Sequence, residues 1–442
     1  MSKKTRDYIF WIFSVIFLLG TIFVSLYASG YKLNLSWPLT FNRLLLKTGM
    51  ISIETEPRGV TIFLNGALQK NFSLNPLNKE YLTTPAKVKN VSPGEYDLRL
   101  ELDGYWPLNK RISVYSGQTT FAENINLFRS NLPLLISNSP ISQLQLSSSG
   151  RYLFVAAPSK IINLKNNETQ NLSGAAAASY WLENEDKLVS GGQIFTPDSS
   201  RSLNYEQVIG LDAKNWYYAS EEKRLYYQNN DLISCFDISS QRNSLIISGH
   251  DYSVYRPHGQ IMFLIENKLG KTKLQKYSLV NQKIEQEISL PADGRYLFKD
   301  DSGQYLSLYD EKNQTLYLIN PDNINYITKT LNQAISWQWI DKSHLFYNNN
   351  WEIYLVDLEN NNESLLTRLG EEIQTIIYNK NNNYLIYTSR SGLHAYDLQV
   401  GISTKIFSNE TVVSPVIDQK NNTLYFWAKI DQQAGVYKLR LQ

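Results

Sequence analysis

The chain has 442 residues, more than one ordinary domain needs, so two or more folded units are expected. Its 43 Lys plus Arg nearly balance its 41 Asp plus Glu, and no basic stripe follows the N-terminus, so nucleic acid is not an expected partner. The single cysteine, Cys235, excludes an intramolecular disulfide framework.

The N-terminal segment predicts a transmembrane helix. Residues 1–7 carry three basic side chains, and residues 8–31 follow without a charge. About 20 apolar residues are enough for a helix to cross the hydrocarbon core, and the basic residues are expected to stay cytoplasmic. We therefore expect a single-pass signal anchor in the lipid bilayer at residues 8–31, with the bulk of the chain extracytoplasmic at the cell membrane. The alternative is a cleaved signal peptide, for which "ASG" at 28–30 supplies small residues.

Beyond a linker at residues 32–48, the composition favours an all-β fold. Tyr (30), Phe (17) and Trp (9) are abundant and favour strands, while recurring Asn clusters favour the turns between strands. Residues 49–128 predict a small β-sandwich, because apolar residues alternate with polar ones on both sides of a Pro-Gly turn. The alternating apolar residues are Ile51, Ile53, Val60, Ile62 and Leu64. Asn65-Gly66 marks a second tight turn, and three more strands are expected after residue 82.

An ordered set of motifs runs through this sandwich segment. A strand that ends in "LNG" is followed by "TP", "SPGEYDLRLELDGYWP" and "ISVYSGQT". This order resembles a PEGA domain, a small sandwich of bacterial and archaeal surface and envelope proteins. The tetrapeptide Pro-Glu-Gly-Ala that names the family appears here as Pro57-Arg58-Gly59-Val60, which departs at two positions. The resemblance implies an interaction or spacer role at the cell surface and brings no catalytic residues.

From residue 131 to residue 442 the sequence repeats about every 40 residues. Similar apolar positions recur at spacings of 41, 41, 41, 38, 40 and 41 residues. They are Phe195, Phe236, Tyr277, Leu318, Val356, Tyr396 and Tyr437. A repeat of this length built from strands indicates a β-propeller with four strands in each blade. We expect eight blades, the first of them at Ile162; seven is the alternative, because the spacing of 33 residues from Ile162 to Phe195 is irregular.

The two ends of the repeat region are expected to meet. Tyr437 lies too near the end of the chain for the last blade to have an outer strand, so "LPLLIS" at residues 132–137 is expected to supply it and close the ring. "SSSGRYLFVA" and "PADGRYLFKD" resemble strand pairs of TolB-like and WD40-like propellers. That resemblance implies the fold and says little about function.

No motif in the chain predicts catalysis. Its four histidines form no HExxH pair, and no Cys/His spacing indicates structural zinc. Neither a G-x-S-x-G elbow nor a Gly-rich phosphate loop that opens a helix is present. We therefore expect no catalytic residue, no metal and no cofactor.

Tryptophans are the remaining candidates for a ligand site. Six fall in the propeller region, where they would either stack on sugar rings or fill the gaps between blades, and filling is the plainer interpretation. Trp337 and Trp339 in "SWQWID" are two residues apart and would point the same way on a strand. We predict them as an exposed pair for ligand stacking.

The predicted function is a non-enzymatic, membrane-anchored envelope protein that presents a propeller to an envelope protein or a cell-wall polysaccharide. The alternative is an extracytoplasmic hydrolase or lyase that uses the propeller funnel. A fold alone does not decide between them. Acidic and histidine side chains gathered in the funnel would favour the enzyme, whereas an aromatic or flat apolar patch would favour binding.

Overall fold

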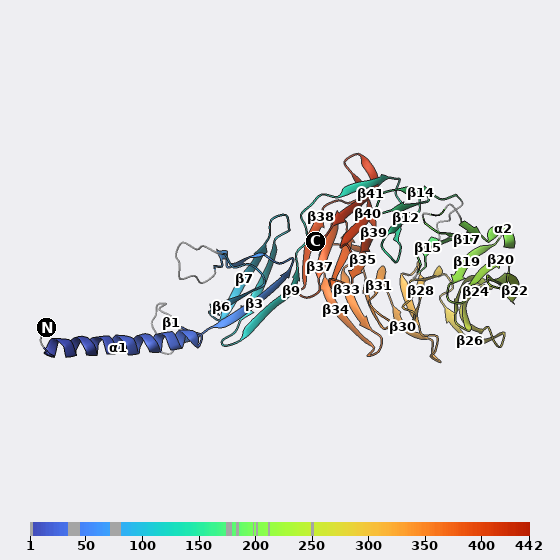
Figure 1. The fold of residues 1–442 in the computed structure, drawn as a ribbon. Helices are drawn as coiled ribbons and strands as arrows, with labels where there is room; N and C mark the ends of the chain where they lie inside the picture. The colour runs from blue at the N-terminus through green and yellow to red at the C-terminus, as the bar shows by residue number, and fades with distance from the viewer. Residues whose placement is uncertain are drawn as a thin grey trace. The chain divides into compact units, whose positions relative to one another are not determined.

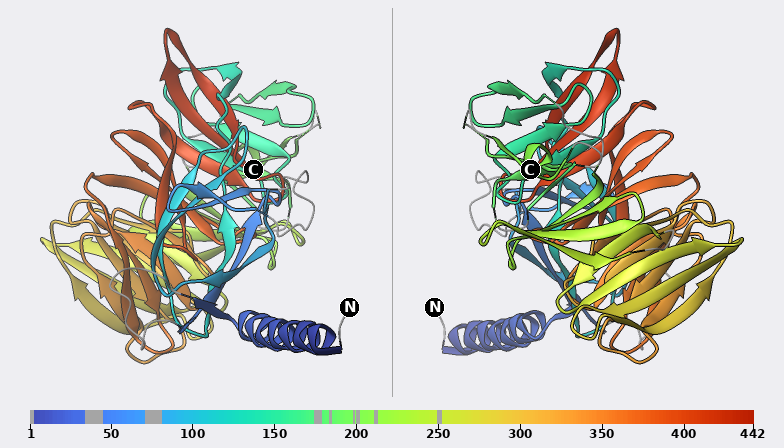
Figure 2. Two further views of the ribbon diagram at one scale, coloured as in Figure 1. Left: turned by 90° about the vertical axis from the view of Figure 1, so that its left-hand side faces the viewer. Right: turned by 90° about the vertical axis from the view of Figure 1, so that its right-hand side faces the viewer.

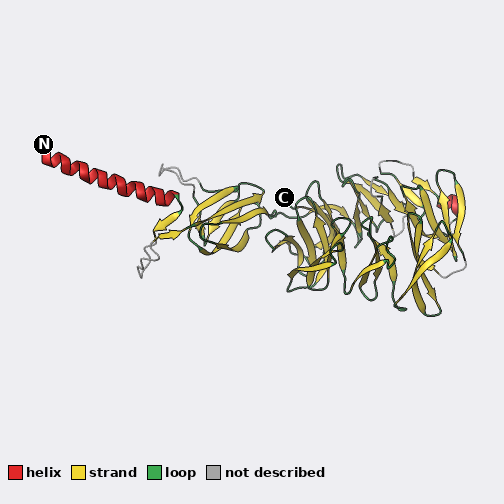
Figure 3. Cartoon of the chain, turned by 90° about the horizontal axis from the view of Figure 1, so that it is seen from below, coloured by secondary structure: helices red, strands yellow, loops and turns green. Residues whose placement is uncertain are grey.

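The computed structural model describes residues 3–33, 45–70, 81–173, 179–182, 185–197, 199, 202–210, 213–248 and 252–442. Apart from the N-terminal helix and one short helix, its regular elements are strands (Figure 3), as the composition predicted. Contacts divide the chain into two compact units. One contains residues 1–131 with 397–406 and 442, and the other contains residues 132–396 with 407–441.

The chain begins with the helix α1 (Lys3–Ala28) (Figure 1), in which no charged residue follows Asp7. Its stretch Thr5–Ala28 has a mean hydropathy of 2.5 with none of the stretch buried, and it is long and apolar enough to cross a membrane. Because α1 begins at Lys3, the charged residues expected to precede the helix form its first turns. The helix ends before Gly30, whose φ of +81° suits a residue without a side chain.

A two-stranded ribbon follows the helix, where the sequence predicted only a linker. β1 (Tyr31–Leu33) pairs antiparallel with β2 (Leu45–Lys47). The backbone N–H and the hydroxyl of Thr48 both donate to the carbonyl oxygen of Gly30, at 2.8 and 2.7 Å. These bonds hold the two ends of the segment together.

The small β-sandwich has two sheets. One has the strand order β6-β3-β9 and the other has the order β5-β4-β7-β8. The sequence predicted three strands after residue 82, but the structure has four, because each of the Gly-containing turns separates two full strands. The bounds are β3 (Gly49–Glu56), β4 (Thr61–Leu64), β5 (Ala67–Leu68), β6 (Ala86–Val91), β7 (Gly94–Glu101), β8 (Leu108–Val114) and β9 (Thr119–Asn126).

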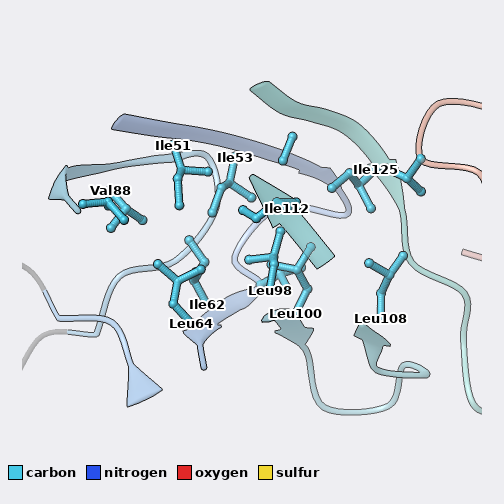
Figure 4. Packing of buried hydrophobic residues seen from close by; sticks show 14 of the residues in the cluster. Ile51, Ile53, Ile62, Leu64, Val88, Leu98, Leu100, Leu108, Ile112 and Ile125 are labelled. Carbon is cyan, nitrogen blue, oxygen red and sulfur yellow. The ribbon is translucent and has the colours of Figure 1, made fainter. Parts of the chain in front are cut away.

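The core of the sandwich includes the alternating apolar residues that the sequence indicated, together with apolar residues of the later strands. Ile51, Ile62, Leu98 and Leu100 are each 0% exposed and lie between the sheets (Figure 4). Burial of side chains of this kind contributes about 2 kcal/mol each. The predicted turn after β4 also forms: Asn65 (φ +48°) and Gly66 (φ +75°) both have positive φ, as a tight hairpin turn requires.

The remaining strands form eight four-stranded sheets in the part of the chain that the structure describes. Seven of them are antiparallel meanders of consecutive strands, from β11-β12-β13-β14 to β35-β36-β37-β38, and the eighth has the order β10-β41-β40-β39. Their bounds are β10 (Leu134–Asn138), β11 (Leu144–Leu146), β12 (Tyr152–Val155), β13 (Lys160–Asn163), β14 (Thr169–Asn171), β15 (Ser179–Trp181), β16 (Leu188–Ser190), β17 (Gln193–Phe195), β18 (Ser202–Asn204), β19 (Lys214–Ala219), β20 (Arg224–Asn229), β21 (Leu232–Asp237), β22 (Arg242–Ile247), β23 (Tyr252–His258), β24 (Ile261–Lys268), β25 (Lys271–Ser278), β26 (Lys283–Leu290), β27 (Tyr296–Lys299), β28 (Leu306–Asp310), β29 (Thr315–Ile319), β30 (Ile327–Leu331), β31 (Ser336–Trp339), β32 (His344–Asn348), β33 (Glu352–Asp357), β34 (Asn362–Arg368), β35 (Ile373–Asn379), β36 (Tyr384–Ser389), β37 (Gly392–Asp397), β38 (Ile402–Phe407), β39 (Val413–Asp418), β40 (Thr423–Ile430) and β41 (Gln433–Arg440), with the short helix α2 (Glu206–Ile209) after β18.

These sheets fan around a common axis to form a β-propeller (Figure 2). The first strands of neighbouring meanders contact each other at β11 and β15, β19 and β23, β23 and β27, and β31 and β35, and in the eighth sheet β39 takes this place and contacts β35. The contact of β39 with β11 joins the last sheet to the first. The first strands are therefore the inner strands of the propeller.

The ring closes as the sequence predicted. β10 pairs with β41, so one sheet combines strands from both ends of the propeller region. The indole N–H of Trp427 donates to the carbonyl oxygen of Ser139 at 3.0 Å. A Cβ at Gly435 would lie 2.5 Å from the carbonyl oxygen of Ser137, so glycine permits the close approach of β10 and β41.

A recurring pentapeptide shapes several hairpin turns. Asp310, Asp357 and Asp418 each begin the pattern Asp-x-x-Asn-Asn/Gln. In the first turn, Oδ1 of Asp310 accepts the backbone N–H of Lys312 at 3.1 Å, and Oδ2 accepts the amide N–H of Asn313 at 2.7 Å. The last residue of each pattern has positive φ, which Asn tolerates better than most residues. The pattern explains why Asn is so frequent between strands.

Candidate functional site

The inner strands of the propeller bring together side chains that lie one repeat apart in the sequence. Tyr217 on β19, Arg256 on β23 and Phe298 on β27 are separated by 39 and 42 residues. The guanidinium carbon of Arg256 is 4.9 Å from the ring centre of Tyr217 and 5.6 Å from that of Phe298. Tyr180 on β15 and Asp301, in the loop after β27, complete a group that we call the Arg256 cluster.

The guanidinium of Arg256 retains hydrogen-bonding capacity. Its Nη2 donates to the carbonyl oxygen of Lys299 at 3.3 Å. Its Nε is buried and has no hydrogen-bond partner within the described ranges. Oδ2 of Asp301 forms an ion pair with this Nε at 3.6 Å, which is beyond hydrogen-bond distance. The side chains of Arg256 and Asp301 are 17% and 20% exposed, so solvent reaches the pair.

The pKa values in the cluster follow from burial and from the nearby charge. Burial acts to lower the pKa of Arg256, but Asp301 and Tyr217 outweigh it and raise that pKa above its usual value. Burial raises the pKa of Tyr180 far above its usual value, so this hydroxyl stays neutral, and it accepts the backbone N–H of Tyr218 at 2.8 Å. The cluster therefore offers a fixed cation beside aromatic rings and a neutral hydroxyl, which suits an anion carried on an apolar or sugar scaffold.

The predicted tryptophan pair lies on the next inner strand, β31, and both rings face the sheet β27-β28-β29-β30. The ring of Trp337 packs 5.0 Å from that of Tyr309, and Trp337 is only 9% exposed. The ring of Trp339 stacks on Tyr305 at 6.1 Å, and its indole N–H donates to the carbonyl oxygen of Asp300 at 3.0 Å. The expected common direction is correct, but the expected exposure is wrong for Trp337, because it fills the space between two sheets. A ligand-stacking role for the pair stays a prediction.

Replacing Trp337 by alanine should destabilise the propeller by about 3 kcal/mol, because the change leaves a cavity beside Tyr309. Trp351, which is 46% exposed, is the matched control, and its replacement by alanine should change stability by less than about 0.5 kcal/mol. Urea denaturation followed by tryptophan fluorescence and circular dichroism measures both variants. Equal effects of the two substitutions would contradict the packing role of Trp337.

Sequence reasoning missed the Arg256 cluster. Its members come from four different sheets, and no local motif marks them. The available signal was the repeat itself, because Tyr217, Arg256 and Phe298 occupy corresponding places in successive repeats. An arginine where the neighbouring repeats have aromatic rings is the irregularity that would have identified the site.

Among the described histidines, His258 at the end of β23 is the one that lies on an inner strand. His344 begins β32, His394 lies on β37, and His250 lies outside the described residues. Nε2 of His394 lies 2.9 Å from Oγ of Ser391 and 3.3 Å from Oε1 of Glu371. Among the described residues no group of three or more His, Cys, Asp or Glu side chains is arranged to hold a metal ion.

His344 should make the stability of the protein depend on pH. Its Nδ1 is 2.9 Å from Oδ1 of Asp341, which is the main cause of its raised pKa, and Asp357 and Glu359 also face it. A His whose pKa is raised by folding stabilises the fold fully below its ordinary pKa, and the effect disappears as the pH rises through the raised value. Wild type should therefore exceed His344→Gln in melting temperature more at pH 5.5 than at pH 8.5. An equal difference at both pH values would contradict the ion pair.

Two open cavities lie beside the sheet β11-β12-β13-β14. The first, about 570 Å³, is lined by Arg151 and Asp186 among others, and the second, about 460 Å³, by Tyr152 and Gln170 among others. Nη2 of Arg151 binds Oδ2 of Asp186 at 2.6 Å, and Lys187 pairs with Glu185 at 2.5 Å. The charges of the first cavity pair at hydrogen-bond distance, whereas Arg256 and Asp301 lie 3.6 Å apart, which makes the cavity a weaker candidate than the Arg256 cluster.

Comparison with known protein families identifies the sandwich. Residues 76–128 match the model of the PEGA domain. The PEGA match covers β6 to β9 and includes the motifs at Thr84-Pro85 and Ser92–Pro107. The Pro57–Val60 tetrapeptide lies outside the PEGA match, in agreement with its departure from the family name. No curated protein matches the chain in sequence.

Solved structures resemble the chain in fold at low identity. A eukaryotic initiation factor is 11% identical, with 71% of this chain and 94% of that chain covered and a TM-score of 0.48. Oligogalacturonate lyase from Vibrio parahaemolyticus is 9% identical, with 69% and 90% covered and a TM-score of 0.39. Hsv2 from Kluyveromyces lactis is 11% identical, with 49% and 71% covered and a TM-score of 0.34. Unlike the PEGA match, these similarities to solved structures concern the fold alone.

Proposed function

We propose that this protein is a non-enzymatic envelope protein, anchored in the cell membrane by α1 and presenting its propeller outside the cytoplasm to a protein or a cell-wall polymer. The observation that carries the proposal is one chain that combines an unburied apolar helix, a PEGA match and a β-propeller. In this arrangement the sandwich serves as a spacer between bilayer and propeller.

The α1 helix supports the membrane part of the proposal. None of Thr5–Ala28 is buried, so no described part of the chain covers its apolar side chains. An apolar surface of this size is stable in water only when something covers it, and a bilayer does so. Basic residues at its N-terminal end favour a cytoplasmic N-terminus.

Cysteine labelling of intact cells tests the orientation. Cys235 is 4% exposed and burial raises the pKa of its thiol to about 11, so it should react slowly with a maleimide. A membrane-impermeant maleimide should label Leu269→Cys, at a position that is 93% exposed, in intact cells. It should label Asp7→Cys only after the membrane is permeabilised. The reverse pattern would overturn the orientation, and loss of the Asp7→Cys segment from the mature chain would indicate a cleaved signal.

Co-sedimentation tests the binding role and its partner. Full-length protein in nanodiscs is mixed with purified cell walls or with a detergent extract of the same cells. Retention on protease-treated walls would indicate a wall polymer, and retention of particular extract proteins would indicate a protein partner. Retention by neither would count against the binding role and would direct attention to the alternative, a hydrolase or lyase, through a substrate screen.

A further inference from the structure

We propose that the Arg256 cluster binds the carboxylate group of a sugar in an acidic polysaccharide. The inference rests on the proposed binding function and deepens it by naming the ligand class and the residue that recognises it. Arg256 is the recognition residue, and Asp301 is the internal carboxylate that the ligand replaces.

Two aromatic rings lie close to the guanidinium of Arg256. Tyr217 lies 4.9 Å and Phe298 5.6 Å from its central carbon, and both rings are partly exposed. A guanidinium has five N–H donors, and those that face neither ring can bind a ligand. A carboxylate has two oxygens in one plane and matches such donors with two parallel hydrogen bonds.

The Nε of Arg256 is buried and has no hydrogen-bond partner in the described part of the chain. A buried donor that makes no hydrogen bond is costly, so the site gains from a ligand that brings an acceptor closer. Asp301 supplies opposite charge at 3.6 Å, but this distance is too long for a hydrogen bond. The guanidinium is thus held in place by charge and rings while its donors stay only partly used.

The backbone holds the carboxylate of Asp301 in position. Its Oδ1 accepts the backbone N–H of Ser307 at 2.9 Å, so the loop between β27 and β28 holds the carboxylate near Arg256. An incoming carboxylate must compete with Asp301 for the cation. Removing the charge of Asp301 should therefore strengthen binding, whereas an ion pair with a purely structural role would make the same change only destabilising.

The aromatic side chains near Arg256 suit a ligand whose carboxylate is attached to a sugar ring. Three partly exposed aromatic side chains lie near the cation: Tyr180, Tyr217 and Phe298. Aromatic rings pack against the C–H faces of sugars, and neutral tyrosine hydroxyls donate to sugar oxygens. A uronate combines both features, because its carboxylate is attached to the sugar ring.

Binding of polymers to full-length protein in nanodiscs tests the proposal. The probes are alginate as a carboxylate polymer, poly(glycerol phosphate) as a phosphate polymer and dextran as a neutral polymer. Wild type should retain alginate in preference to the other two. Arg256→Gln should weaken alginate binding at least about tenfold, and Asp301→Asn should strengthen it by about threefold or more.

Arg295→Gln is the matched control, because Arg295 is an ion-paired arginine that is 82% exposed, and it should leave alginate binding unchanged. Circular dichroism and melting temperature establish that each variant is folded. If Arg256→Gln fails to fold, Asp301→Asn still decides, since unchanged or weaker binding by that folded variant would overturn the proposal. Preference for poly(glycerol phosphate) would overturn the carboxylate class.

The ligand class and the binding role of the protein can be overturned independently of each other. Wall retention without alginate binding would overturn the ligand class and leave the proposed function intact. Loss of both wall and extract retention would count against the proposed function itself. Alginate binding that Arg256→Gln does not weaken would overturn the site.

Discussion

Replacing Gly392 by alanine is expected to prevent the propeller from folding stably. Gly392 begins β37 with a φ of +128°, a conformation that residues with a side chain rarely adopt. A Cβ there would overlap the backbone carbonyl oxygen of Phe407 and would lie 2.8 Å from the backbone nitrogen of Asn409. Strain in φ and backbone overlap together should cost about 4 kcal/mol or more, because neither neighbour is a flexible side chain.

Gly370 provides the matched control for this substitution. It precedes β35 in the same sheet, and a Cβ at this position would meet nothing within 4 Å. Gly370→Ala should be neutral or slightly stabilising, because alanine restricts the unfolded chain. Soluble yield and urea denaturation distinguish the two variants. A stable, normally folded Gly392→Ala protein would show that β37 does not begin as described.

The second large effect is expected at Phe263. This residue lies on β24, is 0% exposed, and packs with its ring 5.4 Å from that of Tyr326. Tyr326 directly precedes β30 of the neighbouring sheet. Its hydroxyl donates a hydrogen bond to the carbonyl oxygen of Leu274 at 2.8 Å. Phe263→Ala should lower the free energy of unfolding by about 4 kcal/mol, because the change leaves a cavity between two sheets that cannot easily collapse.

Leu269→Ala is the control for Phe263→Ala. Leu269 lies in the turn between β24 and β25 and is 93% exposed, so its truncation should change stability by less than about 0.5 kcal/mol. Chemical denaturation of both variants provides the comparison. A loss below about 1 kcal/mol for Phe263→Ala would show that the two sheets do not pack through this ring.

Most of the fold could be predicted from the sequence because its signals are local or periodic. Alternation identified the strands around Ile53 and Ile62, since a side chain on a strand has only two faces to occupy. The repeat of about 40 residues indicated the propeller, and the missing outer strand after Tyr437 indicated its closure by residues 132–137. The β1–β2 ribbon was not predicted, because pairing of such short strands leaves no periodic signal.

The candidate site was harder to predict for physical reasons. Arg256 is a candidate for ligand binding because of its contacts with Tyr217, Phe298 and Asp301. These contacts form only when neighbouring sheets pack. Exposure also depends on packing across sheets. A strand pattern places Trp337 and Trp339 on one face, but it does not tell whether that face meets water or a neighbouring sheet. Here the face meets the preceding sheet, β27-β28-β29-β30.

The sheet that joins β10 to β41 also has a consequence for biosynthesis. A ribosome makes β10 first and β41 last among the strands of the propeller, about 300 residues apart. Until β41 is made, β10 has no partner and β40 has an unpaired edge, so their backbone N–H and C=O groups stay open to pairing with other chains. A chain that stops before residue 433 would lack β41, so premature termination there would produce an aggregation-prone protein rather than a shorter functional one.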